Sequence, residues 1–184
     1  MTSDSSDDLE NVRPIDRAPD NEQPVAGAWN TTLFRSDRVL ISAISFEVYS
    51  SGISFLLAVR LSEGSPFTDN PHWDEGPEGL HLGVEFQDGR RAELGSRPVA
   101  SGPLLRFCGG QGGYRSMDNE LWLHPVPPSG PMAFIIRCGF LGISETRTTI
   151  DATTFSEATS QVIEAWPWAP PARSTSPVGS WFST

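Results

Sequence analysis

The sequence predicts a mainly β, sandwich-like fold of antiparallel strands with one amphipathic helix near the C-terminal end. Apolar and polar residues alternate over several short segments, which is the period of a strand with one buried face. Turn residues separate these segments, as expected for hairpins. Helical spacing of apolar residues occurs in one late stretch, residues 154–166.

The first predicted hairpin is the clearest structural signal. An edge strand is expected over residues 25–34, followed by strands over 39–49 and 53–61 that flank the short turn Ser50-Ser51-Gly52. The positions expected to share a face are Leu40, Ile44, Phe46 and Val48 in the first strand of the hairpin, and Ile53, Phe55, Leu57, Val59 and Leu61 in the second.

Two more hairpins are predicted further along the chain. Residues 80–86 alternate and reach an Asp88-Gly89 turn, with a return strand over 91–94. Residues 120–139 hold two alternating runs on either side of a proline-rich turn. The glycine run at 109–113 is interpreted as a flexible loop between strands, and a last strand is expected over 145–150.

The late helical segment begins at a candidate capping box formed by Thr154 and Glu157. Apolar residues then recur at helical spacing as far as Trp166, and Pro167 ends the segment. We expect this helix to lie across an open end of the sheets, anchored by Phe155 and Trp166.

The predicted domain organisation is one β-sandwich domain over residues 25–168 between two disordered tails. Residues 1–24 are acidic and almost free of aliphatic side chains, so they are expected to stay solvated. Residues 169–184, rich in proline, serine and threonine, are predicted to form the second tail.

Charge and targeting signals narrow the range of partners. The net charge is −10, and residues 1–23 supply half of it, with seven acidic residues against two arginines. The remainder has no basic stripe, which argues against binding to nucleic acid or to anionic membranes. With no apolar run long enough to span a bilayer and no signal peptide, a cytoplasmic location is expected.

The sequence lacks the motifs of common phosphate-binding, metal-binding and catalytic sites. The glycine run has no lysine and leads into a strand, unlike a phosphate-binding loop. The three histidines are not at metal-ligand spacing, and the acidic loop 62–79 lacks the calcium-loop pattern. No nucleophile motif or cysteine–histidine pair is evident, and Cys108 and Cys138 are interpreted as small apolar residues. We therefore predict no catalytic residue, no metal and no cofactor; a paired-carboxylate enzyme using Glu85 and Glu120 is the less favoured alternative.

One set of polar and aromatic residues is the candidate binding surface. Tyr114 and Arg115 follow the glycine run, and both residue types are enriched at interface hot spots. An outward strand face is expected to present Glu120, Trp122 and His124, with His81, Glu85 and Arg137 beside them. For Trp122 itself, burial as ordinary core under a loop or the terminal helix is weighed above an exposed binding role, because large aromatic side chains are mostly buried. The full candidate set is Trp73, Asp74, Glu75, Tyr114, Arg115, Glu120, Trp122 and His124.

Several phrases occur together in a characteristic order: SFEVYSSGISFLLAVRL, HLGVEFQDGRRA, ELWLHPVPPSGPMAFIIRC and GISETRTTIDATTFSEA. Between Trp29 and Trp168 the chain resembles a family of uncharacterised actinobacterial proteins. Its most specific part is the W-x-x-P-x-P-P-x-G-P turn from Trp122 to Pro131. The resemblance implies an immunoglobulin-like β-sandwich and a cytosolic protein, and it brings no activity with it.

The function predicted from these observations is a non-enzymatic protein-interaction domain with a protein partner and a possible homodimer. The alternative is a small-ligand or carbohydrate-binding module that uses Trp73, Trp122 and the acidic loop. A hydrolase is a third and less favoured possibility.

Overall fold

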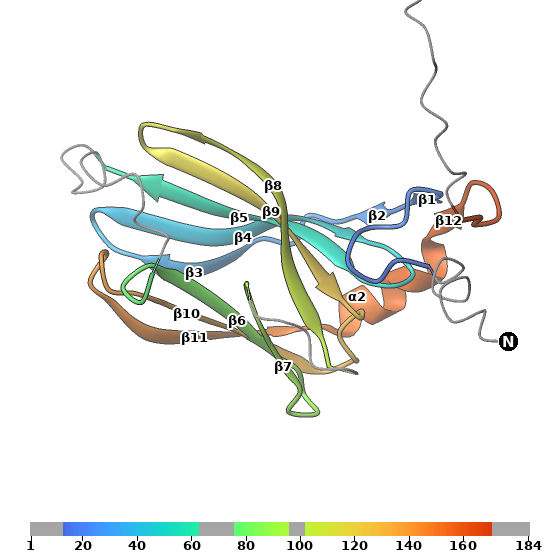
Figure 1. Cartoon of the computed structure of the whole chain (residues 1–184). Helices are drawn as coiled ribbons and strands as arrows, with labels where there is room; N and C mark the ends of the chain where they lie inside the picture. The colour runs from blue at the N-terminus through green and yellow to red at the C-terminus, as the bar shows by residue number, and fades with distance from the viewer. Residues whose placement is uncertain (1–12, 63–75, 96–101, 171–184) are drawn as a thin grey trace, which may run out of the picture.

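Two antiparallel sheets form the body of the protein and face each other across one core (Figure 1). The computed structural model describes residues 13–62, 76–95 and 102–170. The larger sheet has the order β2-β4-β5-β9-β8, with β3 also pairing with β4. Its strands are β2 (Val25–Ala26), β3 (Thr31–Arg35), β4 (Val39–Val48), β5 (Ile53–Leu61), β8 (Leu104–Gly113) and β9 (Ser116–His124).

The smaller sheet has the order β11-β10-β6-β7. Its strands are β6 (Leu80–Glu85), β7 (Arg91–Glu93), β10 (Pro131–Cys138) and β11 (Ile143–Asp151). A third, two-stranded sheet pairs β1 (Glu22–Gln23) with β12 (Ile163–Glu164), which brings the two ends of the described chain together. The mainly β, antiparallel prediction is confirmed.

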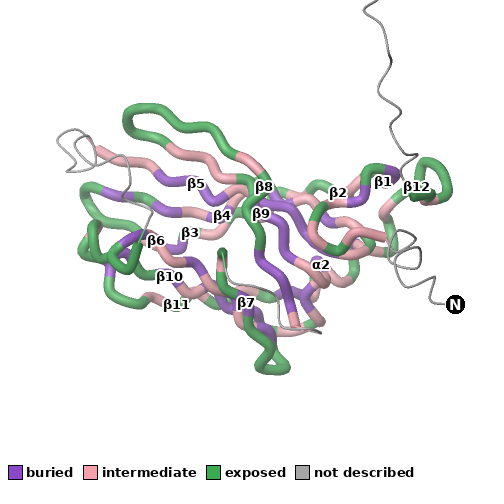
Figure 2. Tube along the Cα trace, viewed as in Figure 1, coloured by how far each residue is buried: buried purple, intermediate pink, exposed green. Residues whose placement is uncertain are grey.

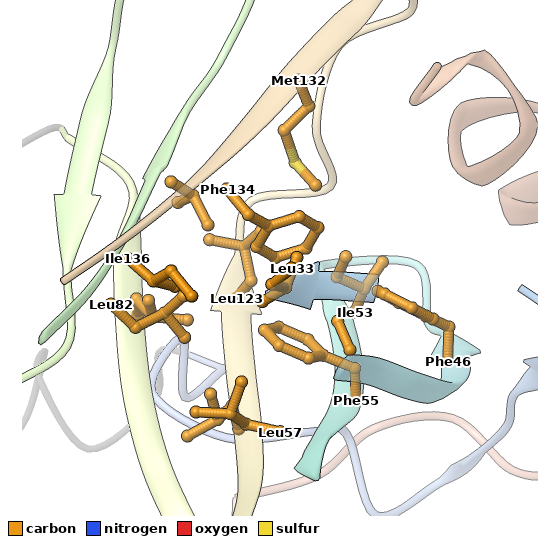
Figure 3. Close-up of a cluster of buried hydrophobic side chains, with 14 of the residues drawn as sticks. Leu33, Phe46, Ile53, Phe55, Leu57, Leu82, Leu123, Met132, Phe134 and Ile136 are labelled. Carbon is orange, nitrogen blue, oxygen red and sulfur yellow. The ribbon is translucent and has the colours of Figure 1, made fainter. Parts of the chain in front are cut away.

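The core lies between the two sheets, where buried residues concentrate (Figure 2). Phe46 stacks on Phe55, with 5.2 Å between the ring centroids, and Phe55 meets Phe134 of the opposite sheet edge to face at 5.6 Å (Figure 3). Such aromatic pairs bury large apolar surfaces in a defined geometry. The alternating positions predicted to face inward in 53–61 and 80–86 fill this core, and Leu61 and Leu80 at the strand ends are half-buried.

The face assignment predicted for β4 is wrong in its first half. Val39, Ile41 and Ala43 are buried, whereas Leu40 is exposed. The pairing with β5 shifts between Ile44 and Glu47, and Ser45 there has a φ of 55°. One extra residue at this bulge reverses the side-chain parity, so that Phe46 and Val48 join the same face as Ile41.

The hairpin predicted over residues 120–139 is also wrong, although both of its strands exist. β9 pairs with β5 and β8, whereas β10 pairs with β6 and β11 in the other sheet. The proline-rich connection crosses from one sheet to the other. Proline lacks a backbone donor, which makes this segment unsuitable for a ladder and suitable for a crossing.

The helix is shorter than predicted. α2 spans Thr153–Ala158, a 3-10 turn covers Thr159–Gln161, and the chain then extends into β12. Phe155 is buried and stacks on Phe46 at 5.2 Å, so this anchor of the helix is confirmed. Trp166 is 60% exposed and is not an anchor. No side chain caps the helix at Ala152, so the Thr154–Glu157 capping box does not form.

The structure also differs from the tail expected over residues 1–24. Residues 1–12 lie outside the described part, but residues 13–24 pack against the larger sheet, and Asn21 is only 1% exposed. Their polar side chains are held by ion pairs and hydrogen bonds rather than by apolar burial. The tail predicted over 169–184 falls mostly outside the described residues, which end at position 170.

Candidate functional site

The predicted surface residues that the structure describes lie in three places: on β9, on the smaller sheet and in the turn between β8 and β9. Trp73, Asp74 and Glu75 lie outside the described residues. Glu120, Trp122 and His124 belong to β9 in the larger sheet, whereas His81, Glu85 and Arg137 belong to the smaller sheet. These two groups do not share a face. Tyr114 and Arg115 form the turn between β8 and β9.

Trp122 is buried beneath the N-terminal segment, residues 13–21. Its side chain is 1% exposed, and its indole nitrogen donates a hydrogen bond of 2.9 Å to the carbonyl oxygen of Ile15. Tyr49 packs edge to face on the ring at 5.6 Å. Trp122 lies outside the cluster between the sheets and forms a small second core on the outer face. The burial expected for Trp122 is confirmed, so this residue is not part of an exposed binding surface.

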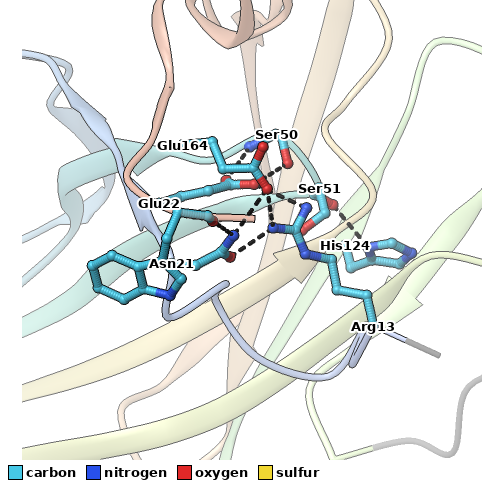
Figure 4. Close-up of polar contacts among 8 residues, drawn as sticks. Arg13, Asn21, Glu22, Ser50, Ser51, His124 and Glu164 are labelled. Atoms are coloured by element: carbon cyan, nitrogen blue, oxygen red, sulfur yellow. Dashed lines mark hydrogen bonds and ion pairs between the residues drawn. The ribbon is translucent and has the colours of Figure 1, made fainter. Parts of the chain in front are cut away.

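A polar clasp (Arg13, Asn21, Glu22 and Glu164) holds the covering segment in place (Figure 4). The guanidinium of Arg13 donates to Asn21 Oδ1 at 2.6 Å and forms an ion pair with Glu22 at 3.0 Å. The Asn21 amide donates to Glu164 Oε1 at 3.0 Å. Glu22 also accepts hydrogen bonds from the backbone nitrogen and the hydroxyl of Ser50. Arg13 Nε is buried and has no hydrogen-bond partner among the described residues, but the other contacts are charged hydrogen bonds and ion pairs. They let a polar segment pack without an apolar core of its own.

His124 lies beside this clasp and contacts backbone rather than a reactive side chain. Its Nδ1 is 2.7 Å from the carbonyl oxygen of Ser51, which requires a proton on Nδ1. The Ser51 hydroxyl is buried and has no hydrogen-bond partner among the described residues. This arrangement orients the histidine towards a turn and not towards a nucleophile.

The glycine run is part of a strand, so the prediction of a flexible loop is wrong. Residues Gly109 to Gly113 pair with β9 in a continuous antiparallel ladder, after a bulge between Phe107 and Gly109. β9 offers an open edge that the backbone of the run can join without any contribution from side chains. The tip of the β8–β9 hairpin lies at the opposite end of the molecule from the separate β1–β12 sheet (Figure 1).

β8 is the outer strand of the larger sheet. Among the described strands, β9 is its pairing partner. Residues 110–116 are all exposed, and two aromatic side chains flank the run: Phe107 is 52% exposed and Tyr114 is 73% exposed. The guanidinium of Arg115 lies over the Tyr114 ring, 5.9 Å from its centroid. The structure thus brings Tyr114 and Arg115 next to an open sheet edge, with Glu120 exposed on the neighbouring strand.

The thiol of Cys108, on β8, is expected to have low reactivity. Cys108 is exposed on β8, but partial burial and the nearby Glu120 raise the pKa of its thiol above the usual value. The thiolate is the reactive form, so a raised pKa lowers reactivity. Cys138 is buried in the core, where its thiol donates to the carbonyl oxygen of Glu78 at 3.8 Å.

The outer face of the smaller sheet carries a second polar arrangement. The Glu85 carboxylate bridges Arg147 and Arg91, with 2.5 Å between Glu85 Oε2 and the Arg91 guanidinium. Arg147 and then Arg91 hold the pKa of Glu85 below its usual value. Glu85 is therefore committed to ion pairs, and Glu120 lies on β9 in the other sheet, so the structure does not bring the two carboxylates together as a catalytic pair.

Two further observations concern ligands and membranes. Within the described residues, no group of three or more histidine, cysteine, aspartate or glutamate side chains could hold a metal ion. In the same part of the chain, no helix has the length and apolar character needed to cross a bilayer.

Sequence reasoning missed Phe107 and Gly83. Phe107 pairs with the buried Leu121 and alternates with the buried Leu105, yet its side chain is 52% exposed. Gly83 interrupts an alternating strand, a pattern that indicates close approach to the backbone. That signal was present in the sequence.

Comparisons with known proteins give no relative for this chain: no protein-family model matches it, and searches of the curated proteins and of the solved structures return no match. A functional assignment for this protein therefore rests on the geometry of the structure alone.

Proposed function

We propose that this protein is an interaction domain that binds an extended segment of a partner protein along the open edge of β8. The observation that carries the proposal is the edge itself. A glycine strand without a described outer neighbour is flanked by the exposed aromatic residues Phe107 and Tyr114. An outer strand presents backbone N–H and C=O groups that a further strand can pair with.

Most of the glycines are not required by the hairpin. A Cβ atom on Gly109, Gly112 or Gly113 would approach no atom closer than 4.0, 3.6 or 3.5 Å, respectively. Gly110 differs, because a Cβ there would come within 2.8 Å of Asn119 Oδ1 and 3.0 Å of the Asp118 carbonyl oxygen. Glycine inside a strand costs about 0.5–1 kcal/mol relative to alanine. An unobstructed approach for a partner backbone accounts for the three glycines that packing does not require.

The flanking side chains supply anchors for such a partner. Phe107 and Tyr114 stand at the two ends of the glycine run, and Arg115 is stacked on Tyr114. Aromatic residues and arginine dominate the energetics of protein interfaces. Main-chain pairing along the run would provide affinity, and the anchors would provide selectivity for the side chains of the partner.

The order of strands supports an immunoglobulin-like sandwich as the framework of this proposal. The orders β4-β5-β9-β8 and β11-β10-β6-β7 match the A-B-E-D sheet and the G-F-C sheet extended by C′. In this correspondence β8 is strand D, an outer strand. The cytosolic location and the actinobacterial relationship expected from the sequence stay predictions.

Selection of extended peptides from a displayed random library tests the proposal. We expect the selected peptides to protect the backbone amides of residues 104–113 from hydrogen exchange. The double substitution Gly109→Lys and Gly112→Lys should weaken their binding at least about tenfold, because lysine on a sheet edge disfavours pairing. Both positions have room for the new side chains.

The matched control places two lysines on β11, the outer strand of the smaller sheet. Ser144→Lys and Thr149→Lys change exposed positions and should leave binding intact. Peptides that bind equally well to the β8 double variant, or that protect the smaller sheet instead, would contradict the assignment.

A further inference from the structure

We infer that a trough on the outer face of the smaller sheet binds a small, flat organic carboxylate with a single negative charge. This site is independent of the proposed interaction edge, because β8 belongs to the other sheet. The cavity measures about 440 Å³, which is within the usual range for small-molecule sites.

The trough exists because Gly83 has no side chain. Gly83 pairs with Ile135 on one side and with Glu93 on the other, so these three residues form one row across β10, β6 and β7. The adjacent rows carry long side chains, including His81 and Arg91, which form the walls. Ile135 and the backbone of Gly83 leave a flat, partly apolar floor.

Packing does not explain the glycine at this position. A Cβ on Gly83 would lie 3.5 Å from the carbonyl oxygen of Ala92 and 4.0 Å from that of Ile135, which are ordinary contacts. Any larger residue would therefore fit the sheet, but its side chain would occupy the trough. A strand interior generally favours side chains other than hydrogen. Glycine at this position therefore keeps the trough open at the surface. A planar group can lie directly on the peptide backbone there.

The charges around the trough select the ligand. Arg91 is paired with Glu85, and Glu93 is paired with His81, whose Nδ1 lies 3.5 Å from its carboxylate. Arg137 lines the trough and is exposed, and the described residues provide it with no hydrogen bond or ion pair. A guanidinium can bind a carboxylate through two parallel hydrogen bonds. Glu93 and Glu145 at the rim would repel a second negative charge, which favours a monoanion.

The test uses benzoate as the probe and benzamide as its uncharged counterpart. Each is titrated into the full-length, isotopically labelled protein while amide chemical shifts are followed. We expect benzoate to shift the resonances of Leu82, Gly83 and Ile136 with a dissociation constant on the order of 1 mM, as for other fragments of this size. Benzamide should bind at least tenfold more weakly.

Three variants locate the site. Gly83→Val fills the trough and should abolish the shifts, and Arg137→Gln should weaken binding at least tenfold. Thr32→Val, a change at an exposed strand position of the other sheet, should bind benzoate as the wild type does. Equal binding of benzoate and benzamide, retained binding by Gly83→Val, or no response of the wild type would each overturn the inference. None of these outcomes affects the β8 proposal, which has its own variants.

Discussion

The indole nitrogen of Trp122 reaches the carbonyl oxygen of Ile15, 107 positions earlier in the chain, at 2.9 Å. Around this bond, residues 13–21, with two arginines and two aspartates, cover the outer face of the larger sheet. Asp16 extends the contact through an ion pair with Arg106 on β8. The cover thus reaches the strand that carries the proposed interaction edge.

Replacing Trp122 with alanine should destabilise the protein by about 3–5 kcal/mol, because a large, fully buried ring leaves a cavity and the Ile15 carbonyl loses its donor. Urea unfolding measures this loss. Trp166→Ala is the matched control, since Trp166 is 60% exposed and its backbone carbonyl remains. Its effect should stay within about 0.5 kcal/mol. Equal effects of the two substitutions would show that Trp122 is not the anchor of the cover.

Asn21→Ala should cost about 1–3 kcal/mol, because the amide is itself buried and connects Arg13, Glu164 and the Trp166 carbonyl. Amide hydrogen exchange should accelerate at Ala165, whose nitrogen donates to the Asn21 carbonyl oxygen at 2.8 Å. The exposed Asn30→Ala substitution provides the comparison. If Ala165 exchanges at the same rate in both variants, the clasp does not depend on this side chain.

Two glycine substitutions should act in opposite directions. A Cβ on Gly52 would lie 2.5 Å from the Leu123 carbonyl oxygen and 2.5 Å from the Trp122 ring, so Gly52→Ala should destabilise by about 1–3 kcal/mol. Gly83→Ala meets only ordinary contacts and should stabilise the strand by about 0.5–1 kcal/mol. Thermal unfolding of the two variants side by side distinguishes them. A loss of stability in Gly83→Ala would mean that packing, and not the surface, requires that glycine.

Tyr49 should titrate unusually late. Burial and then the neighbouring Glu47 raise its pKa from 10.0 to about 12. The folded state therefore holds this proton more tightly than the unfolded state, and the associated stability is complete below pH 10 and is lost as the pH rises towards 12. Ultraviolet absorbance reports the ionisation, and Tyr49→Phe should remove this component of the alkaline loss. An unchanged alkaline profile in Tyr49→Phe would rule out the linkage.

Local patterns predicted much of the fold. Strict alternation located β5 and β6 and their buried residues, because the period of two is a direct consequence of a strand with one buried face. The same rule misassigned β4, since a single bulge at Ser45 reverses parity and leaves no trace in the hydrophobic pattern. Likewise, alternation located β9 and β10 but could not show that they belong to different sheets. Pairing between sheets depends on contacts that no short window contains.

The site was less predictable than the fold. Tyr114 and Arg115 were identified from residue type alone, and the open edge beside them depends on β8 forming a strand from glycines, which have a low strand propensity. Trp122 was ambiguous because its cover comes from a polar segment that composition places in solvent. Ion pairs of Arg13 and the hydrogen bonds of Asn21 stabilise that segment, and such long-range polar contacts have no signature in composition.

The pairing of β1 with β12 has a consequence for how this domain can be joined to other bodies. Residue 22 lies opposite residue 164, and Arg13, the first described residue, is 3.8 Å from the Glu164 carboxylate. The described chain therefore enters and leaves the domain at neighbouring points. The β8–β9 hairpin lies towards the other end (Figure 1). If a neighbouring domain, a surface or a probe were attached through either chain connection near β1 and β12, the β8–β9 hairpin would point away from the attachment. The domain could equally be inserted into a loop of a host protein as a self-contained module, because its two connections are close together.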